Sequence, residues 1–565
     1  MSKASSSVGQ RPAVPSGRDA QAFPTLRNEQ VDRVRPFAVA ETLAADTEVF
    51  QRGQREADFF VVLSGCIEIY DYDCDGQPQV FTKHCDQQFT GEIDLFSNRK
   101  VLVAGRTSGD TDVLRLNRKA FREMLAAEPD IAEVVLRAFI IRRLGILESN
   151  LGGSYLVGSK DDALTLKICR FLRGNGYPAQ ALFIEDGPLA SELLAKHDKN
   201  EADLPLLLCH GEEVLSKPTI LEVGEAIGIV EWPDDETCYD LAVIGGGPGG
   251  MASAVYGASE GLRTVVLERE APGGQASTSS KIENYLGFPN GLSGQELAGR
   301  AQIQAQKFGA TLALPMNVTG ILGDRPPYTI RIDGSRDVKA RSIVIASGAT
   351  YRKLGLENDA QFEGCGIHYA ATAIEAGYCE AEDVVVVGGG NSAGQAAVFL
   401  SNHAKHVHIL VRRDSLATTM SDYLVQRIHK SNKITLHTQT EITQLGGERR
   451  LETIDWKNRS TGEVSSNPIR HLFLMIGAVP NSGYLNGCVL TDKNGFICTG
   501  PDVVAQSQWL LSERPPELFE TSLPSVFAIG DVRANSVKRV ASAVGEGSIC
   551  VQFVHRVLAE AARED

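Results

Sequence analysis

The segment Tyr239-Asp240-Leu241-Ala242-Val243-Ile244-Gly245-Gly246-Gly247-Pro248-Gly249-Gly250 decides the fold of the larger part of this chain. Its first six residues are typical of a buried strand, and the glycines allow a tight turn into a helix. Backbone N–H groups at a helix N-terminus bind a pyrophosphate. Glu268 ends the next strand, where its carboxylate can accept from ribose hydroxyls. The pattern predicts a dinucleotide site at Gly245, Gly247, Gly250 and Glu268.

A second copy of this pattern begins with the four valines at 384–387. Gly388, Gly390 and Ala393 take the places of the three glycines, and the following strand ends in Arg412 and Arg413 instead of an acid. Two cations at this place suit the 2′-phosphate of NADPH. Because no acid stands there, the ribose acceptor that NADH prefers is missing. We therefore expect NADPH at this site, with NADH as the alternative.

Size and charge limit the functions to consider. A chain of 565 residues is longer than a single hydrophobic core usually supports, so three or four domains are expected. A net charge of -15 argues against a nucleic-acid partner, and no apolar run approaches the roughly 20 residues of a membrane helix. The eleven cysteines include no Cys-x-x-Cys, and residues 1–18 do not read as a signal peptide. We expect a cytoplasmic protein with mostly buried, reduced thiols.

Short β-rich runs, among them 59–63 and 66–70, precede helical periodicity from Leu114 to Leu147. This region resembles the jelly-roll barrel of cyclic-nucleotide-binding domains. The resemblance implies a phosphate cassette with Gly91 and Glu92 at its start and Arg99 on the cyclic phosphate, although the stretch from Glu92 to Arg99 is shorter than usual. A barrel that serves only packing or dimerisation is the alternative. The closing helices predict a homodimer.

Residues 154–232 follow the order strand, helix, strand, helix, two strands and helix. This order resembles thioredoxin and glutaredoxin domains, in which the proline corresponding to Pro205 is cis. The redox position falls at Ser159-Lys160-Asp161-Asp162, which contains no cysteine, and Cys169 and Cys209 are interpreted as packing residues. We expect a structural module, or one that docks a partner.

From about Cys238 to Leu558 the chain resembles low-molecular-weight thioredoxin reductases, which are FAD- and NAD(P)H-dependent pyridine nucleotide-disulfide oxidoreductases. The resemblance implies that Asp531 accepts from a ribityl hydroxyl and that Arg539 faces the pyrimidine end of the flavin, where a cation favours the anionic reduced form. The remaining matches to flavin-contacting positions are Gly274, Gln275, Asn284, Gly348, Gly530 and Ala541.

In the segment 364–373, Ala370 and Ala373 occupy the two positions where that family carries its Cys-x-x-Cys. A dithiol relay needs two thiolates, so no catalytic residue is assigned. The favoured function is hydride transfer from NADPH to FAD and then to an unidentified non-thiol acceptor, a small molecule or a protein. Two alternatives stay open: a thioredoxin-disulfide reductase with displaced cysteines, Cys365 being the nearest, and a flavin-based redox or nucleotide sensor.

The predicted fold is therefore multi-domain: a β jelly-roll barrel with helices, an α/β thioredoxin-like domain, and two three-layer α/β dinucleotide-binding domains. The boundaries are a flexible tail (1–33), the cyclic-nucleotide-binding-like domain (34–150), the thioredoxin-like domain (154–232), the FAD-binding domain (238–353 and 480–565) and the NAD(P)H-binding domain (354–479).

Overall fold

The structure is a computed structural model that describes most of the chain. It covers residues 19–564 except 73–77, 92–94, 96–98, 149–153, 210–212, 235, 278, 280–281, 283–284, 334–335, 357, 363–364, 370, 372, 418 and 512–513. The chain divides into two compact units, each described by itself. The first comprises residues 1–159, 167–232 and 312–315, and the second comprises 160–166, 233–311 and 316–565.

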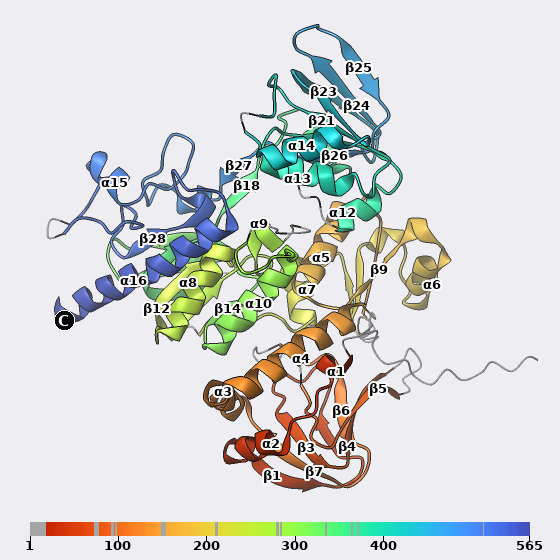
Figure 1. Ribbon diagram of the computed structural model, residues 1–565, viewed down its shortest axis with the longest axis vertical. Helices are drawn as coiled ribbons and strands as arrows, with labels where there is room; N and C mark the ends of the chain where they lie inside the picture. Colours follow the sequence, from red (N-terminus) through yellow and green to blue (C-terminus); the bar gives the residue numbers. More distant parts are fainter. Residues whose placement is uncertain are drawn as a thin grey trace, which may run out of the picture. The chain divides into compact units, whose positions relative to one another are not determined.

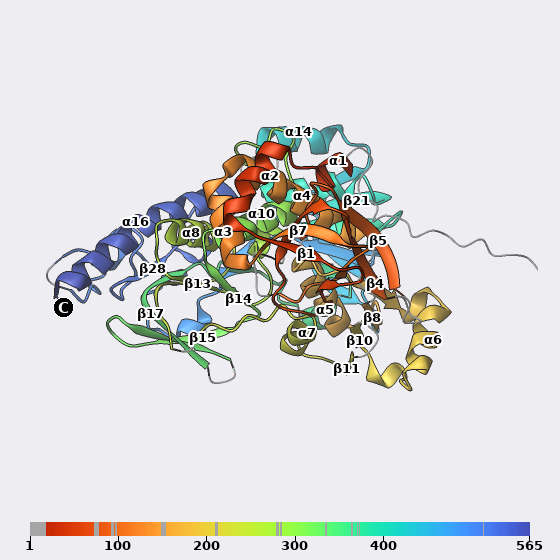
Figure 2. The same cartoon turned by 90° about the horizontal axis from the view of Figure 1, so that it is seen from below.

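The first unit contains the amino-terminal β region, residues 39–148, which holds two antiparallel sheets. One has the order β1 (Val39–Leu43), β7 (Thr111–Leu116), β3 (Phe59–Ser64), and the other β2 (Glu48–Phe50), β6 (Ala104–Thr107), β4 (Cys66–Tyr72), β5 (Pro78–Cys85). Helices α3 (Arg118–Ala127) and α4 (Pro129–Glu148) follow (Figure 2). The rings of Phe59 and Phe121 lie 4.7 Å apart in the core.

Two expectations for this region are corrected. Leu114 belongs to β7, and the first closing helix begins at Arg118, because the Asn117 side chain accepts from Ala120 N and caps it there. Residues 19–33, expected in a flexible tail, include helices α1 (Asp19–Ala22) and α2 (Asn28–Val34). Val31 and Val34 are buried, so apolar packing holds α2 in place.

The middle α/β region, residues 154–232, has its elements in the predicted order. They are β8 (Tyr155–Gly158), α5 (Ala163–Gly174), β9 (Gln180–Phe183), α6 (Pro188–Lys196), β10 (Leu206–Cys209), β11 (Glu213–Ser216) and α7 (Ile220–Ala226). The sheet order is β11-β10-β8-β9, with β8 and β9 parallel. The Leu204–Pro205 bond is cis. Residues 160–166, which lead into and open α5, group with the second unit.

All but residues 312–313 of a seven-stranded sheet belong to the second unit. Its order is β14 (Thr311–Ala313), β13 (Thr264–Leu267), β12 (Cys238–Ile244), β17 (Arg336–Ile345), β16 (Tyr328–Ile332), β15 (Val318–Leu322), and β28 (Val526–Ala528) pairs with β17. The pairs of β12 with β13 and β17 are parallel, as the buried-strand pattern predicts. Helix α8 (Pro248–Ser259) packs against α10 (Gly294–Lys307) and α16 (Val540–Glu564) (Figure 1).

A five-stranded parallel sheet forms the second dinucleotide-type half. Its order is β19 (Ile367–His368), β26 (His471–Leu474), β20 (Asp383–Val387), β21 (His406–Leu410), β22 (Ile434–His437). Helices α12 (Ala373–Tyr378), α13 (Asn391–Leu400) and α14 (Asp422–Lys430) accompany it, and so does the antiparallel sheet β23 (Thr440–Gly446), β24 (Thr453–Asn458), β25 (Val464–Asn467). The strands β18 (Ala349–Tyr351) and β27 (Ala478–Pro480) pair where the chain enters and leaves this half.

Length and apolar character together decide whether a helix can cross a membrane. None of the helices in the described part of the chain has both.

Candidate cofactor sites and the altered redox segment

The first glycine loop connects β12 to α8 and has no room for side chains at two of its positions. Gly245 has a φ of +103°, and a Cβ there would lie 2.5 Å from Ala346 O. A Cβ on Gly250 would lie 1.9 Å from Gly245 O. Gly247 precedes α8 as its N-cap residue. The loop therefore turns tightly and leaves the first N–H groups of α8 at the end of the sheet, where they can bind an anion.

Glu268 lies beside this loop, directly after β13. Its Oε2 accepts from Gly246 N at 2.6 Å, and its Oε1 accepts from Glu270 N at 2.8 Å. Burial raises the pKa of the Glu268 carboxyl, against the two backbone hydrogen bonds that lower it. The predicted ribose acceptor and the glycine loop are thus brought together.

Gly274, the first residue of α9 (Gly274–Ser277), also lies at this loop. Its φ is +50°, and a Cβ on it would lie 3.1 Å from Gly247 Cα. Gln275 follows in the same short helix. Gly348 has a φ of +67° and lies between β17 and β18. Asn284 lies outside the described residues.

Gly530 and Asp531 follow β28, which pairs with β17 in the seven-stranded sheet. Gly530 N donates to Glu546 Oε2 at 2.7 Å, and burial raises the pKa of Asp531. Sequence reasoning missed Lys538, whose Nζ donates to Asp531 O at 2.8 Å. The signal was present, since Lys538 directly precedes Arg539 in the predicted flavin segment. Two members of that segment are exposed, namely Arg539 and Ala541.

The second glycine loop connects β20 to α13 in the same way. Gly388 has a φ of +147°, and a Cβ there would lie 2.3 Å from Met475 O. Gly390 is the N-cap residue of α13, and Ala393 is fully buried in its first turns. Arg412 and Arg413 are exposed after β21, the strand next to β20. Both guanidinium groups are therefore exposed to solvent.

The segment that carries the two alanines lies between β19 and α12. Ala370 lies outside the described residues, and Ala373 is the first residue of α12. On β19, His368 Nε2 lies 3.2 Å from His471 Nδ1. Cys365 is buried, and its Sγ donates to Asp161 O. Burial, together with the nearby Asp161 and Asp162, raises the pKa of this thiol to about 11, so Cys365 is protonated at neutral pH.

The first residue of the predicted nucleotide cassette, Gly91, contacts a buried arginine of α4. Arg142 donates to Gly91 O at 2.8 Å and to Phe89 O at 3.1 Å. Glu92 lies outside the described residues. Arg99 is 8% exposed, and its Nη1 donates to Asn175 O of the middle region at 3.0 Å. Sequence reasoning missed Arg142, although two adjacent arginines inside the apolar stretch 138–146 signal buried partners.

Comparison with known proteins identifies the larger part of the chain. Residues 239–547, more than half of it, match the pyridine nucleotide-disulphide oxidoreductase family. The chain belongs to this family. Residues 40–128 match the cyclic nucleotide-binding domain.

The oxidoreductase part is similar to several thioredoxin reductases. The one from Bacillus subtilis is 32% identical over 327 residues, which cover 58% of this chain and 96% of that protein. NADPH-dependent thioredoxin reductase 3 of Arabidopsis thaliana is 33% identical over 330 residues, 57% of this chain and 59% of that protein. The crystal structure of Lactococcus lactis thioredoxin reductase in its FR conformation aligns with a TM-score of 0.51 at 30% identity, covering 57% of this chain and 99% of that one.

FAD and NADPH are the cofactors of this oxidoreductase family, and the structure fits them. Neither Gly250 nor Gly388 has space for a Cβ, which is the close approach of backbone that a pyrophosphate needs. One loop is followed by a carboxylate, Glu268, and the other by two exposed cations, so the two sites differ in charge as FAD and NADPH require.

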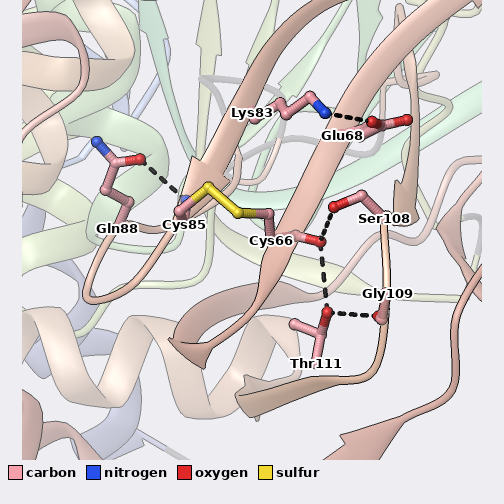
Figure 3. The surroundings of a disulfide bond; sticks show 8 residues. All are labelled: Cys66, Glu68, Lys83, Cys85, Gln88, Ser108, Gly109 and Thr111. Carbon is pink, nitrogen blue, oxygen red and sulfur yellow. Dashed lines mark hydrogen bonds and ion pairs between the residues drawn. A yellow bond between two sulfur atoms is a disulfide. The ribbon is translucent and has the colours of Figure 1, made fainter.

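The oxidoreductase part holds no disulfide among its described residues; the one disulfide described is in the amino-terminal β region (Figure 3). Cys66 and Cys85 stand opposite each other on β4 and β5, with Cα atoms 4.2 Å apart. The two thiols come within bonding reach because they are a directly opposed antiparallel pair. The other eight described cysteines are free, in line with the expectation of mostly reduced thiols. Burial raises the pKa of Cys169 to about 11 and of Cys209 to about 12, in keeping with packing roles.

Proposed function

We propose that this chain is an FAD-dependent NADPH oxidoreductase that passes electrons from its flavin to a non-thiol acceptor, a small molecule or a redox protein. The observation that carries the proposal is the pair Ala370 and Ala373 in a chain of this family. An alanine methyl can neither attack a disulfide nor leave from one. The buried, protonated thiol of Cys365 does not replace them.

The FAD site in this proposal is built on the first glycine loop. Gly245, Gly247 and Gly250 present backbone N–H groups to the pyrophosphate, Glu268 accepts from the adenosine ribose, and the remaining contacts come from Gly274, Gln275, Asn284, Gly348, Gly530, Asp531, Arg539 and Ala541. Bound FAD supplies a two-electron acceptor for hydride. Lys538 supports Asp531 through its main-chain oxygen.

The NADPH site is built on the second loop. Gly388, Gly390 and Ala393 let the backbone approach the pyrophosphate, and Arg412 and Arg413 bind the 2′-phosphate. These contacts hold the nicotinamide nucleotide so that its hydride carbon can approach the flavin.

The amino-terminal β region in this proposal is a jelly-roll barrel that binds a cyclic nucleotide and adjusts the reductase, with Gly91, Glu92 and Arg99 as its cassette residues. Its match to the cyclic nucleotide-binding domain and its two antiparallel sheets support this role. The middle α/β region is a thioredoxin-like docking module, which its strand order and cis Leu204–Pro205 bond support. We further propose a cytoplasmic homodimer that pairs through α3 and α4.

Anaerobic titration of the oxidised holoprotein with NADPH tests the electron path. Flavin bleaching complete at about one equivalent per FAD is expected, because FAD alone takes two electrons. The matched control is the double variant Cys66→Ser/Cys85→Ser, which removes the disulfide that the structure contains.

Uptake of about two equivalents in the wild type but one in the control would show that NADPH also reduces the Cys66–Cys85 disulfide to two thiols. Uptake of two in both proteins would reveal a further disulfide that exchanges electrons with the flavin. That result would contradict the proposal and favour a thioredoxin-disulfide reductase with displaced cysteines.

A further inference from the structure

Helix α16 packs against the first turn of α8 with no room between the two backbones (Figure 1). A Cβ on Gly547 of α16 would lie 2.4 Å from Gly249 O of α8, and a Cβ on Gly249 would lie 3.1 Å from Ala543 O. Ser253 Oγ donates to Gly547 O at 3.2 Å. Backbones packed this closely do not shift against each other, so this stretch of α16 is fixed relative to the first glycine loop, which α8 directly follows.

Glu546 lies on the same stretch of α16 and binds the chain at the end of β28. Its Oε2 accepts from Gly530 N at 2.7 Å and from Arg533 Nε at 3.3 Å, and its Oε1 accepts from Arg533 Nη2 at 2.5 Å. The side chains of Glu546 and Arg533 are only 13% and 17% exposed, and the Arg533 guanidinium lies 5.3 Å from the ring centre of Phe519. Both carboxylate oxygens are engaged, so Glu546 is held in one orientation.

Asp531, the residue after Gly530, is half-buried and has an acceptor to offer. Among the described residues, none donates a hydrogen bond to its carboxylate; Lys538 donates to its main-chain oxygen instead. Burial raises the pKa of Asp531, and the nearby charge of Glu546 adds to the shift. Because a desolvated acceptor without a donor is unfavourable, this carboxylate suits a ligand that brings a hydroxyl donor.

We infer that Glu546 is a positioning residue of the flavin site, which fixes the Asp531 carboxylate at a set distance from the first glycine loop. It does so by holding Gly530 N from a helix that is itself packed on α8. A bound FAD must meet both places at once, and a hydrogen bond weakens steeply when its atoms are displaced. The inference rests on the ribityl contact proposed above for Asp531.

Release of FAD from the full-length holoprotein measures how firmly this contact holds the flavin. The oxidised holoprotein is diluted, and the rise in fluorescence of free FAD gives the release rate. Glu546→Ala and Asp531→Ala are each expected to release FAD roughly tenfold faster than the wild type, because each loses a hydrogen bond that involves a charged group. A wild-type release rate in Glu546→Ala would overturn the inference.

Glu546→Gln separates the bond to Gly530 from the ion pair with Arg533, because a glutamine oxygen still accepts from an N–H but carries no charge. Its release rate is expected within about threefold of the wild type. If it releases FAD as fast as Glu546→Ala, the ion pair matters and the positioning role is overturned. Should Glu546→Ala retain no FAD at all, retention in Glu546→Gln supports the role, and loss there overturns it.

Glu560→Ala is the matched control, because Glu560 is also a carboxylate of α16 that pairs with an arginine. Its Oε2 lies 2.9 Å from Arg514 Nε, and its side chain is 47% exposed. It follows Glu546 by 14 residues, which is about 21 Å along the helix. This variant should release FAD at the wild-type rate.

The double variant Glu546→Ala/Asp531→Ala shows whether Glu546 acts through Asp531. Effects that pass through one contact do not add, so the double variant should release FAD within about twofold of Asp531→Ala. A residue that only stabilises the fold would add its own effect. Release roughly 100-fold faster than the wild type, the product of two independent effects, would therefore overturn the inference.

Asp531→Ala alone tests the site on which the inference rests. A wild-type release rate in this variant would contradict the flavin contact proposed for Asp531, and the role of Glu546 would fall with it. Fast release in Asp531→Ala with wild-type release in Glu546→Ala would leave the proposed site intact and overturn only the positioning role.

Discussion

His368 Nε2 lies 3.2 Å from His471 Nδ1, and His471 Nε2 lies 3.6 Å from Glu382 Oε2. The three side chains form a chain from a partly exposed carboxylate to the strand that precedes Ala370. In a hydrogen bond between two imidazole nitrogens, one nitrogen donates and the other accepts. Burial lowers the pKa of His471 and so keeps it neutral near pH 7, although Glu382 opposes the shift.

This arrangement predicts the tautomers. The carboxylate favours a proton on His471 Nε2, which leaves Nδ1 as the acceptor and makes His368 Nε2 the donor. Long-range nitrogen–proton correlation spectra of protein labelled at histidine should show both residues protonated on Nε2. In Glu382→Ala the preference of His471 should weaken, while exposed His429 stays unchanged as the control. A proton on His471 Nδ1 in the wild type would contradict the prediction.

Gly250→Ala should abolish FAD retention. The new Cβ would lie 1.9 Å from Gly245 O, a backbone atom that cannot move without opening the first glycine loop. Overpacking of this kind costs about 1–3 kcal/mol or more. The ratio of flavin to protein absorbance in the purified variant measures the loss.

The control for this variant is Gly299→Ala in α10, where a Cβ would meet nothing within 4 Å. Alanine in a helix interior is more stable than glycine by roughly 0.5–1 kcal/mol, so Gly299→Ala should keep its FAD and be at least as stable as the wild type. Full FAD content in Gly250→Ala would show that this loop does not bind the flavin nucleotide.

Arg412→Ala and Arg413→Ala should weaken NADPH more than NADH. Each arginine is exposed at the end of β21, and a hydrogen bond to a charged group contributes about 1.5–3 kcal/mol. The KM for NADPH should therefore rise roughly 10- to 100-fold in each variant, while the KM for NADH stays nearly constant. Stopped-flow flavin reduction with each nucleotide gives both values.

Arg427→Ala, on α14 of the same half, is the control for a general loss of positive charge. Equal losses for NADPH and NADH in Arg412→Ala would show that this arginine acts on the pyrophosphate or on folding instead of the 2′-phosphate.

The sequence predicted those parts of the structure that depend on local patterns. Gly245 and Gly388 could be assigned because a strand, a tight turn and a helix follow one another within about 15 residues. The contacts of Arg99 with Asn175 and of Cys365 with Asp161 could not, because they join residues 76 and 204 positions apart. Only the packing of whole elements brings such pairs together.

The Cys66–Cys85 disulfide could be predicted from the sequence only in part. The strand that carries Cys66 was predicted at 66–70, but its register with β5 decides whether the cysteines face each other, and one residue of slippage would separate them. Composition gave no information on this register and favoured free thiols instead.

Lowering the pH should destabilise the second dinucleotide-type half through His408. Burial lowers its pKa to about 4, and the rings of His437 and Trp456 lie against it. In the unfolded chain the pKa is about 6.5. Between these values the unfolded state binds the proton and the folded state does not, so stability is full above about pH 6.5 and falls as the pH drops toward 4. The loss is of the order of 1–3 kcal/mol.

Urea unfolding at pH 7.5 and pH 5, followed by Trp456 fluorescence in a Trp232→Phe/Trp509→Phe background, measures this effect. The midpoint should fall at pH 5, and His408→Gln should reduce that fall because the glutamine does not titrate. His429→Gln, a substitution at an exposed position on α14, is the control and should leave the pH dependence unchanged. If His408→Gln keeps the full pH dependence, other groups are responsible, and His437, whose pKa burial also lowers, is the next residue to replace.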